Sequence, residues 1–83
     1  MNEFVVYVLY SHSTDKTYVG YTSDLINRMQ SHNIFDKKGY TRNFRPWMVL
    51  YVEFYESKSA AMKRELELKT GKGREFIRKQ LLG

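Results

Sequence analysis

Apolar residues concentrate in three short segments with the composition of β-strands. Residues 4–10, FVVYVLY, are β-branched and aromatic with apolar side chains at both parities, which predicts a strand covered on both faces. The polar turn 11–16 separates this strand from TYVGYT at 17–22, so we expect a hairpin. WMVLYVEFY at 47–55 predicts a third strand, whose pairing direction cannot be determined from the pattern.

The register of the hairpin determines which side chains share a face. Pairing Tyr10 with Asp15 places Tyr7 opposite Tyr18, and the Cβ atoms of cross-strand partners lie about 5 Å apart. A slip of one residue would place the two tyrosines on opposite faces. In the chosen register, Tyr7 and Tyr18 face each other.

The segment 23–33, SDLINRMQSHN, has the pattern of an amphipathic helix, with Thr22 or Ser23 as its N-cap. Arg28 and His32 are separated by one helical turn and therefore lie along one edge of the apolar stripe. That stripe consists of Leu25, Ile26 and Met29.

The last third of the chain is predicted to be helical. Ser57 or Ser59 caps a helix that runs to about Thr70, TGKG at 70–73 interrupts it, and residues 74–82 form a short final helix. The fold class is therefore α/β of the α+β type, with the element order β-β-α-loop-β-α-α.

One carboxylate of the longer helix has an unusual position. A helical wheel places Glu65 in the middle of the apolar arc that contains Ala61 and Leu68, and places Arg64 on the opposite, solvated side. A carboxylate directed at a core is costly unless it is paired or bound to a metal. Two interpretations remain open, because Glu65 can pair with Lys69 one turn later or serve as a functional ligand.

Composition limits the class of protein. A length of 83 residues predicts one small domain, 1–83, and 42% hydrophobic with 16% aromatic residues excludes intrinsic disorder. The chain has no cysteine, which excludes disulfides and Cys-based zinc sites and fits a reducing compartment. Because no signal peptide and no apolar run of about 18 residues is visible, we expect a cytoplasmic protein with no membrane segment.

The positive charge of the chain, +5 in total, is unevenly distributed. Residues 57–83 contain eight Lys/Arg against three Glu, and residues 36–46 contain four Lys/Arg against one Asp. A basic surface favours a polyanion as partner, and nucleic acid is the commonest one. The alternative is a solvated basic face that maintains solubility.

Each remaining polar candidate also has an ordinary structural explanation. Tyr7 and Tyr18 can be core residues whose hydroxyls reach a surface partner. Arg28 can bind a backbone carbonyl, and His32 can cap the end of its helix. Taken singly, none of these residues indicates a particular chemistry.

Taken together, the same residues resemble the signature of the GIY-YIG nuclease family. The pattern is Val5-Val6-Tyr7, ten residues, then Tyr18-Val19-Gly20, followed by Arg28 and His32. In AAMKRELELK, Ala61 and Glu65 resemble the family's Ala-xxx-Glu helix. GYTRNFRPWMVLYVE and RELELK are similar in particular to a small stand-alone bacterial branch related to the N-terminal domain of the repair nuclease UvrC.

The resemblance implies a three-stranded antiparallel sheet flanked by helices, and metal-dependent hydrolysis of a DNA phosphodiester. Carried over by position, Tyr7 and Tyr18 would handle the attacking water, and Arg28 would meet the scissile phosphate. Glu65 would hold one Mg²⁺ or Mn²⁺, and His32 matches a recurrent family position. The residues expected to contact DNA phosphates are Lys37, Lys38, Arg42, Arg45 and Lys69.

The sequence departs from the family pattern in three respects, the first of which is that no asparagine follows Glu65. Val5 stands where the family name has Gly, which a mid-strand position tolerates well. No targeting module is recognisable, so we expect the chain to act alone, to form a homodimer or to rely on a partner protein.

Three functional hypotheses follow. The favoured one is an endonuclease or nicking enzyme that acts on branched or damaged DNA. The first alternative is a non-catalytic nucleic-acid-binding module of the same fold, in which Tyr40, Phe44 and Trp47 stack on bases. The second is a protein-interaction domain whose aromatic residues only form the core.

Overall fold

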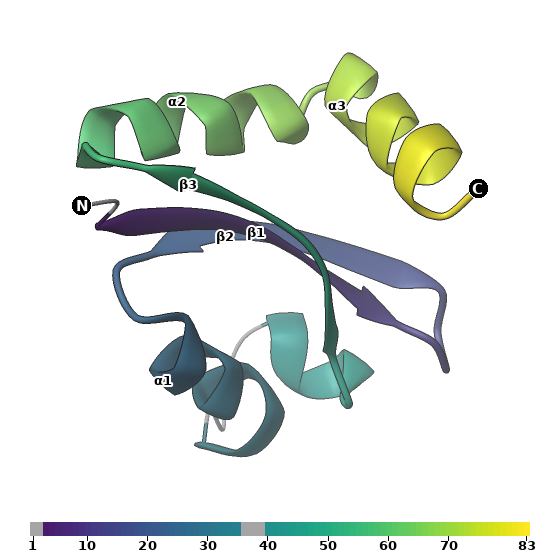
Figure 1. The fold of residues 1–83 in the computed structure, drawn as a ribbon. Helices are drawn as coiled ribbons and strands as arrows, with labels where there is room; N and C mark the ends of the chain where they lie inside the picture. Colours follow the sequence, from purple (N-terminus) through teal and green to yellow (C-terminus); the bar gives the residue numbers. More distant parts are fainter. Residues whose placement is uncertain (1–2, 36–39) are drawn as a thin grey trace.

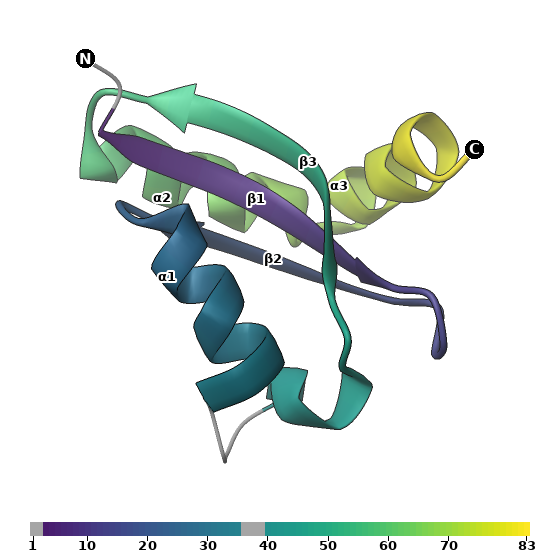
Figure 2. The same cartoon turned by 60° about the horizontal axis from the view of Figure 1, so that its bottom comes forward.

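The protein is built on a single antiparallel sheet with helices on both faces (Figure 1). The computed structural model describes residues 3–35 and 40–83. The strands follow the spatial order β2-β1-β3 and are β1 (Phe4–Ser11), β2 (Lys16–Thr22) and β3 (Met48–Tyr55). The helices are α1 (Leu25–Gln30), α2 (Lys58–Leu68) and α3 (Gly71–Phe76). Figures 1 and 2 show α2 and α3 on one face of the sheet and α1 on the other. The expected α+β class and antiparallel sheet are confirmed.

Three short helical segments complete the described chain. Ser31–Phe35 continues α1 as a π-helical turn, Tyr40–Phe44 is a 3₁₀ helix before β3, and Ile77–Leu81 continues α3 as a second π-helical turn. No helix in the described ranges is long and apolar enough to cross a bilayer.

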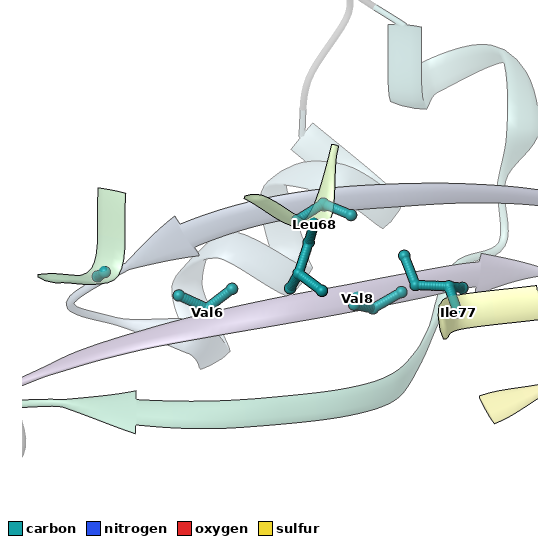
Figure 3. Packing of buried hydrophobic residues seen from close by; sticks show 6 residues of the cluster. Val6, Val8, Leu68 and Ile77 are labelled. Carbon is teal, nitrogen blue, oxygen red and sulfur yellow. The ribbon is translucent and has the colours of Figure 1, made fainter. Parts of the chain in front are cut away.

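The central strand β1 is buried on both faces, as its apolar residues at both parities predicted. Val6 and Val8 pack against Leu68 and Ile77 beneath α2 and α3 (Figure 3). The opposite face contributes Tyr7 and Leu9 to a second cluster with Trp47, Leu25 and Met29. Tyr7 is therefore buried on the α1 side of the sheet.

The expected hairpin register is wrong by two residues. Tyr7 pairs with Gly20, and Leu9 pairs with Tyr18. Asp15 adopts φ 55°, a left-handed conformation that short polar residues tolerate, and its backbone N–H donates to the Ser11 carbonyl at 2.8 Å. Because a shift of two preserves the face of every side chain, Tyr7 and Tyr18 remain diagonal neighbours with ring centroids 6.4 Å apart.

The helix starts follow side-chain caps. Asp24 caps α1 by accepting from the Asn27 N–H at 3.1 Å, in place of either of the two preceding residues that the sequence suggested. Ser57 caps α2, as one of the two expected candidates. Thr70 caps α3, so the glycines that follow it begin a new helix at once.

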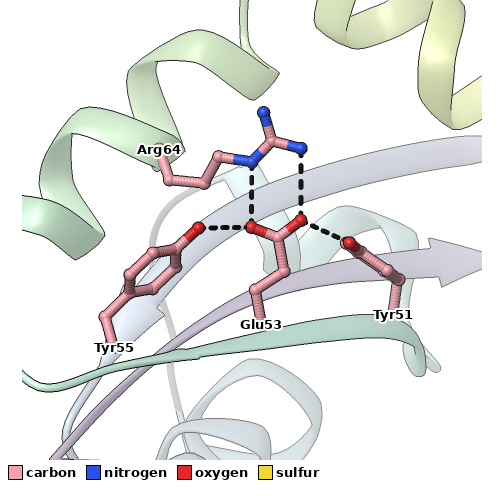
Figure 4. Close-up of polar contacts among 4 residues, drawn as sticks. All are labelled: Tyr51, Glu53, Tyr55 and Arg64. Atoms are coloured by element: carbon pink, nitrogen blue, oxygen red, sulfur yellow. Dashed lines mark hydrogen bonds and ion pairs between the residues drawn. The ribbon is translucent and has the colours of Figure 1, made fainter.

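A carboxylate on β3 fastens α2 to the sheet (Figure 4). Glu53 accepts hydrogen bonds from the hydroxyls of Tyr51 and Tyr55 and from Arg64, whose Nε lies 2.9 Å from Oε1 and whose Nη2 lies 3.1 Å from Oε2. The sequence prediction that Arg64 lies on the solvated side of its helix is therefore wrong. The forked ion pair fixes the position of the residue that precedes Glu65.

This cluster should make stability depend on pH. Burial alone would raise the pKa of Glu53, but the hydrogen bonds from Arg64, Tyr51 and Tyr55 outweigh it and lower that pKa below its ordinary 4.5. A depressed carboxyl pKa gives stability that is present above the unfolded-state value and lost as pH falls through the folded-state value.

We expect Glu53→Gln to lower the free energy of unfolding by about 1–3 kcal/mol at pH 7. The difference in the free energy of unfolding between the variant and the unmodified protein should narrow as pH falls below about 4.5. Chemical denaturation at several pH values measures this difference. A gap that stays constant down to pH 3 would contradict an ionised, paired Glu53.

Candidate active site

The Tyr7 hydroxyl lies at the centre of the polar groups on the α1 side of the sheet. Its side chain is 1% exposed, and its oxygen lies 2.9 Å from Nε2 of the buried His32. The His32 ring packs edge-on against both tyrosines, with centroid distances of 5.8 Å to Tyr7 and 5.0 Å to Tyr18. The sequence motif residues are thus brought together by the hairpin and the turn after α1.

Gly20 is the residue that allows Tyr7 to lie as it does. A Cβ at position 20 would lie 2.5 Å from the Tyr7 Oη and 2.6 Å from its Cζ. The phenol of Tyr7 therefore fills the space that a side chain at position 20 would occupy. This close approach gives a physical reason for a glycine within a strand.

Arg28 brings a positive charge to the same hydroxyl. It extends from the exposed side of α1 and forms a hydrogen bond with Tyr7. Burial raises the pKa of Tyr7 to about 12, and the hydrogen bond with Arg28 offsets this only in part. Tyr7 is accordingly a neutral phenol at physiological pH.

Glu65 approaches from the opposite helix layer. Its side chain is 16% exposed, and Oε2 lies 3.6 Å from the Lys69 Nζ. The buried line of α2 is formed by Ala61 and Leu68, with Glu65 and Arg64 on its two flanks. The expectation that Glu65 lies in the middle of the apolar arc is therefore corrected, because it lies at the edge of that arc, where the surface opens.

An open cleft of about 580 Å³ connects these groups. Tyr7, Tyr18, Arg28 and Glu65 all line it, so four of the five catalytic candidates from the sequence share one concave surface. The fifth, the buried His32, is not among the lining residues. The other lining residues are Phe4, Gly20, Tyr21, Thr22, Ser23 and Lys58. Arg28 and Lys58 give the cleft two cationic groups, which suits a phosphate ligand.

Lys58 was missed by the sequence analysis, although a signal was available. It begins α2 and precedes Glu65 by seven residues, which is about two helical turns, so both side chains emerge on one face. A wheel drawn from the N-cap onward would have placed this cation beside the carboxylate.

The donor set of the cleft fits one hydrated cation. Within the described ranges, no group of three or more His, Asp or Glu side chains is arranged to hold a metal ion. Mg²⁺ commonly retains several waters and binds one or two carboxylates together with substrate phosphate. Glu65 supplies one hard oxygen ligand at the border of an open cleft, which is compatible with that mode of binding.

The basic segment before β3 is only partly available for DNA contact. Arg42 is exposed, whereas Arg45 is half-buried and donates to the carbonyls of Ser31 and His32. Arg45 thus supports the turn that carries His32, and its expected contact with a DNA phosphate stays a prediction. Lys37 and Lys38 lie outside the described residues.

Comparisons with known proteins cover nearly the whole chain. The family profile of the GIY-YIG catalytic domain matches residues 3–79, which include all four cleft residues named above. UPF0213 proteins of Staphylococcus aureus strains Mu3 and MW2 are each 40% identical to this chain over 70 residues, which is 84% of this chain and 84% of each relative. The solution NMR structure of the UPF0213 protein BH0048 from Bacillus halodurans is similar with a TM-score of 0.54 and 30% identity, and the match covers 93% of this chain and 82% of that one.

Proposed function

Since the chain belongs to the GIY-YIG family of nuclease domains, we propose that it is an endonuclease that hydrolyses a DNA phosphodiester with one bound Mg²⁺ or Mn²⁺. The observation that supports this proposal is the single cleft lined by Tyr7, Tyr18, Arg28 and Glu65. The similarity of the sequence to the UvrC branch leads us to propose branched or damaged DNA as substrate.

The pair formed by Tyr7 and His32 provides a route for the proton of the attacking water. A phenolic oxygen donates one hydrogen bond and accepts others, and Nε2 of His32 accepts when its proton resides on Nδ1. As water transfers a proton to the Tyr7 oxygen, the phenolic proton passes to Nε2. The new P–O bond forms while the bond to the leaving oxygen breaks, and that oxygen takes a proton from solvent.

This relay avoids a free tyrosinate. Burial raises the pKa of Tyr7 to about 12, so full deprotonation before attack would leave only a very small reactive fraction near neutral pH. A neutral phenol that gains and loses a proton in one step does not require that population. Tyr18, which packs on the same imidazole, helps to orient the pair.

The charged groups of the cleft stabilise the reacting phosphate. The guanidinium of Arg28 has five N–H donors, so it can retain its bond to Tyr7 and still bind a phosphate oxygen. Glu65 would hold the divalent cation, which would offset the charge that grows on the phosphate oxygens. Lys58 adds a second positive charge from the α2 side.

The runner-up is a nucleic-acid-binding module that does not cleave. One contact favours it, because the Lys69 ammonium lies 3.6 Å from Oε2 of Glu65, the carboxylate that would hold the cation. Incubation with duplex, nicked, flap and branched DNAs, in Mg²⁺ or Mn²⁺ and in EDTA, separates the two functions. Metal-dependent products support the nuclease, whereas binding to these DNAs without products in either metal supports the module.

Tyr7→Phe should lower the cleavage rate by about 10²–10⁴-fold, because it removes the hydroxyl of a general acid–base relay. Tyr10→Phe is the matched control, since it also removes a tyrosine hydroxyl from β1. That hydroxyl donates to Asp15 at the turn and lies outside the proposed relay. Single-turnover cleavage of the best substrate measures both variants. Equal rates for Tyr7→Phe and the control would eliminate the relay.

A further inference from the structure

A smaller hollow of about 260 Å³ adjoins the cleft along the edge strand β2. Tyr18 lines both the cleft and this hollow. On α2, Glu65 borders the cleft, and Lys69, one turn later, borders the hollow. The residues that line the hollow are Thr17, Tyr18, Val19, Leu68, Lys69, Arg74 and Ile77. The two depressions therefore follow one another along β2.

The hollow is cationic. Among the described residues that line it, Lys69 and Arg74 carry positive charge and none is acidic. Arg64, Arg78 and Lys69 form ion pairs with Glu53, Asp15 and Glu65 respectively. Arg74 takes part in no ion pair with the described part of the chain, so it is the principal phosphate-binding candidate of the hollow. An exposed arginine that lines a depression without a carboxylate partner is suited to a phosphate.

The remaining walls suit the sugar-phosphate backbone of a nucleic acid. The buried side chains of Leu68 and Ile77 and the half-buried Tyr18 ring border the hollow, and Thr17 provides a hydroxyl. Because β2 is an edge strand, one side of its backbone lies outside the sheet ladder and is open to a ligand. A DNA strand whose phosphate occupies the cleft would thus continue over a surface of complementary, positive charge.

We propose that this hollow is a second phosphate subsite, in which Arg74 and Lys69 bind a backbone phosphate of the same DNA strand a few nucleotides from the cleaved bond. The position of the subsite relative to the cleaved bond rests on the proposed nuclease function. Its affinity for phosphate does not, because the charges and shape of the hollow are independent of catalysis.

The test uses Arg74→Ala and a matched control. Lys72→Ala removes the same charge from the same helix, but Lys72 borders other depressions of the surface. DNA binding is measured in EDTA at several salt concentrations, with oligonucleotides that carry one neutral methylphosphonate at each position in turn.

We expect Arg74→Ala to weaken binding about tenfold and to reduce the salt slope by about 0.9 on duplex or about 0.7 on a single strand. At one position of the oligonucleotide, the methylphosphonate should weaken binding to the unmodified protein by the same factor. At that position it should cause no further loss of affinity in Arg74→Ala. Lys72→Ala should still be weakened by the methylphosphonate at that position. If Arg74→Ala and Lys72→Ala respond alike at every position, the subsite does not exist.

The two proposals can fail separately. If the unmodified protein never cleaves but the Arg74 pattern appears, the subsite is supported and the nuclease function is not. If cleavage occurs and the Arg74 pattern is missing, the nuclease function stands and the subsite is overturned.

Discussion

Glu65→Gln will abolish metal-dependent cleavage while leaving the fold and the affinity for DNA in EDTA nearly unchanged. Glutamine retains the size and helix propensity of glutamate but lacks the charge that anchors a divalent cation. A bound cation supplies several kcal/mol of charge stabilisation, so the rate should fall by more than about 10²-fold. Melting temperature, DNA affinity in EDTA and cleavage in Mg²⁺ are measured on the same preparation.

These three measurements separate three roles for Glu65. As a mere partner of Lys69, whose side chain is 49% exposed, it would contribute at most a few tenths of a kcal/mol, and cleavage would persist. As a buried structural charge, its loss would destabilise the protein strongly and remove every activity together. Glu67→Gln, which neutralises an exposed carboxylate on the same helix, is the control. Full cleavage by Glu65→Gln would exclude the metal-ligand role.

The parts of the fold that follow from local pattern were predictable from the sequence. The apolar runs correctly predicted the three strands, and Ser57 was one of the two residues expected to cap α2. The shared face of Tyr7 and Tyr18 was predicted even though the register was wrong. Side-chain alternation has a period of two, and the error was also two.

Contacts between distant segments were not predictable. The partner of Arg64 is Glu53 on β3, and the partners of Arg45 are carbonyls that follow α1. A helical wheel contains no information about which groups the neighbouring layer presents. It also treats an apolar arc as wholly buried, although α2 contacts the sheet along a narrower line that leaves Met62 and Leu66 41% and 61% exposed. Ile26 of α1 is 77% exposed for the same reason.

Prediction of the cleft requires both the local sequence pattern and the contacts between distant segments. Its residues are recognisable from their order along the chain, but its opening depends on how α2 and α1 pack on opposite faces of the sheet (Figures 1 and 2). The sequence could not reveal that the position opposite Tyr7 has to lack a side chain, because this requirement arises from the observed register. Gly20 is therefore the most direct test of the geometry.

Gly20→Ala should impair both stability and cleavage. The new Cβ would lie 2.5 Å from the Tyr7 Oη, so the phenol or the strand must move. Overpacking of a filled site costs about 1–3 kcal/mol in the free energy of unfolding. If Tyr7 turns aside to relieve the contact, the stability loss is smaller, but the hydroxyl leaves Nε2 of His32 and the relay is broken.

Cleavage should therefore fall whichever group moves, and we expect a loss comparable to that of Tyr7→Phe at a temperature where the variant is fully folded. Gly71→Ala is the matched control, because a methyl group at position 71 would meet open space among the described residues, and the substitution is expected to be neutral or slightly stabilising. Urea denaturation gives the stability of each variant, and single-turnover kinetics gives the rate. A folded Gly20→Ala that cleaves at the unmodified rate would mean that the position of the Tyr7 hydroxyl does not determine catalysis, and Tyr18 would then become the candidate for handling the attacking water.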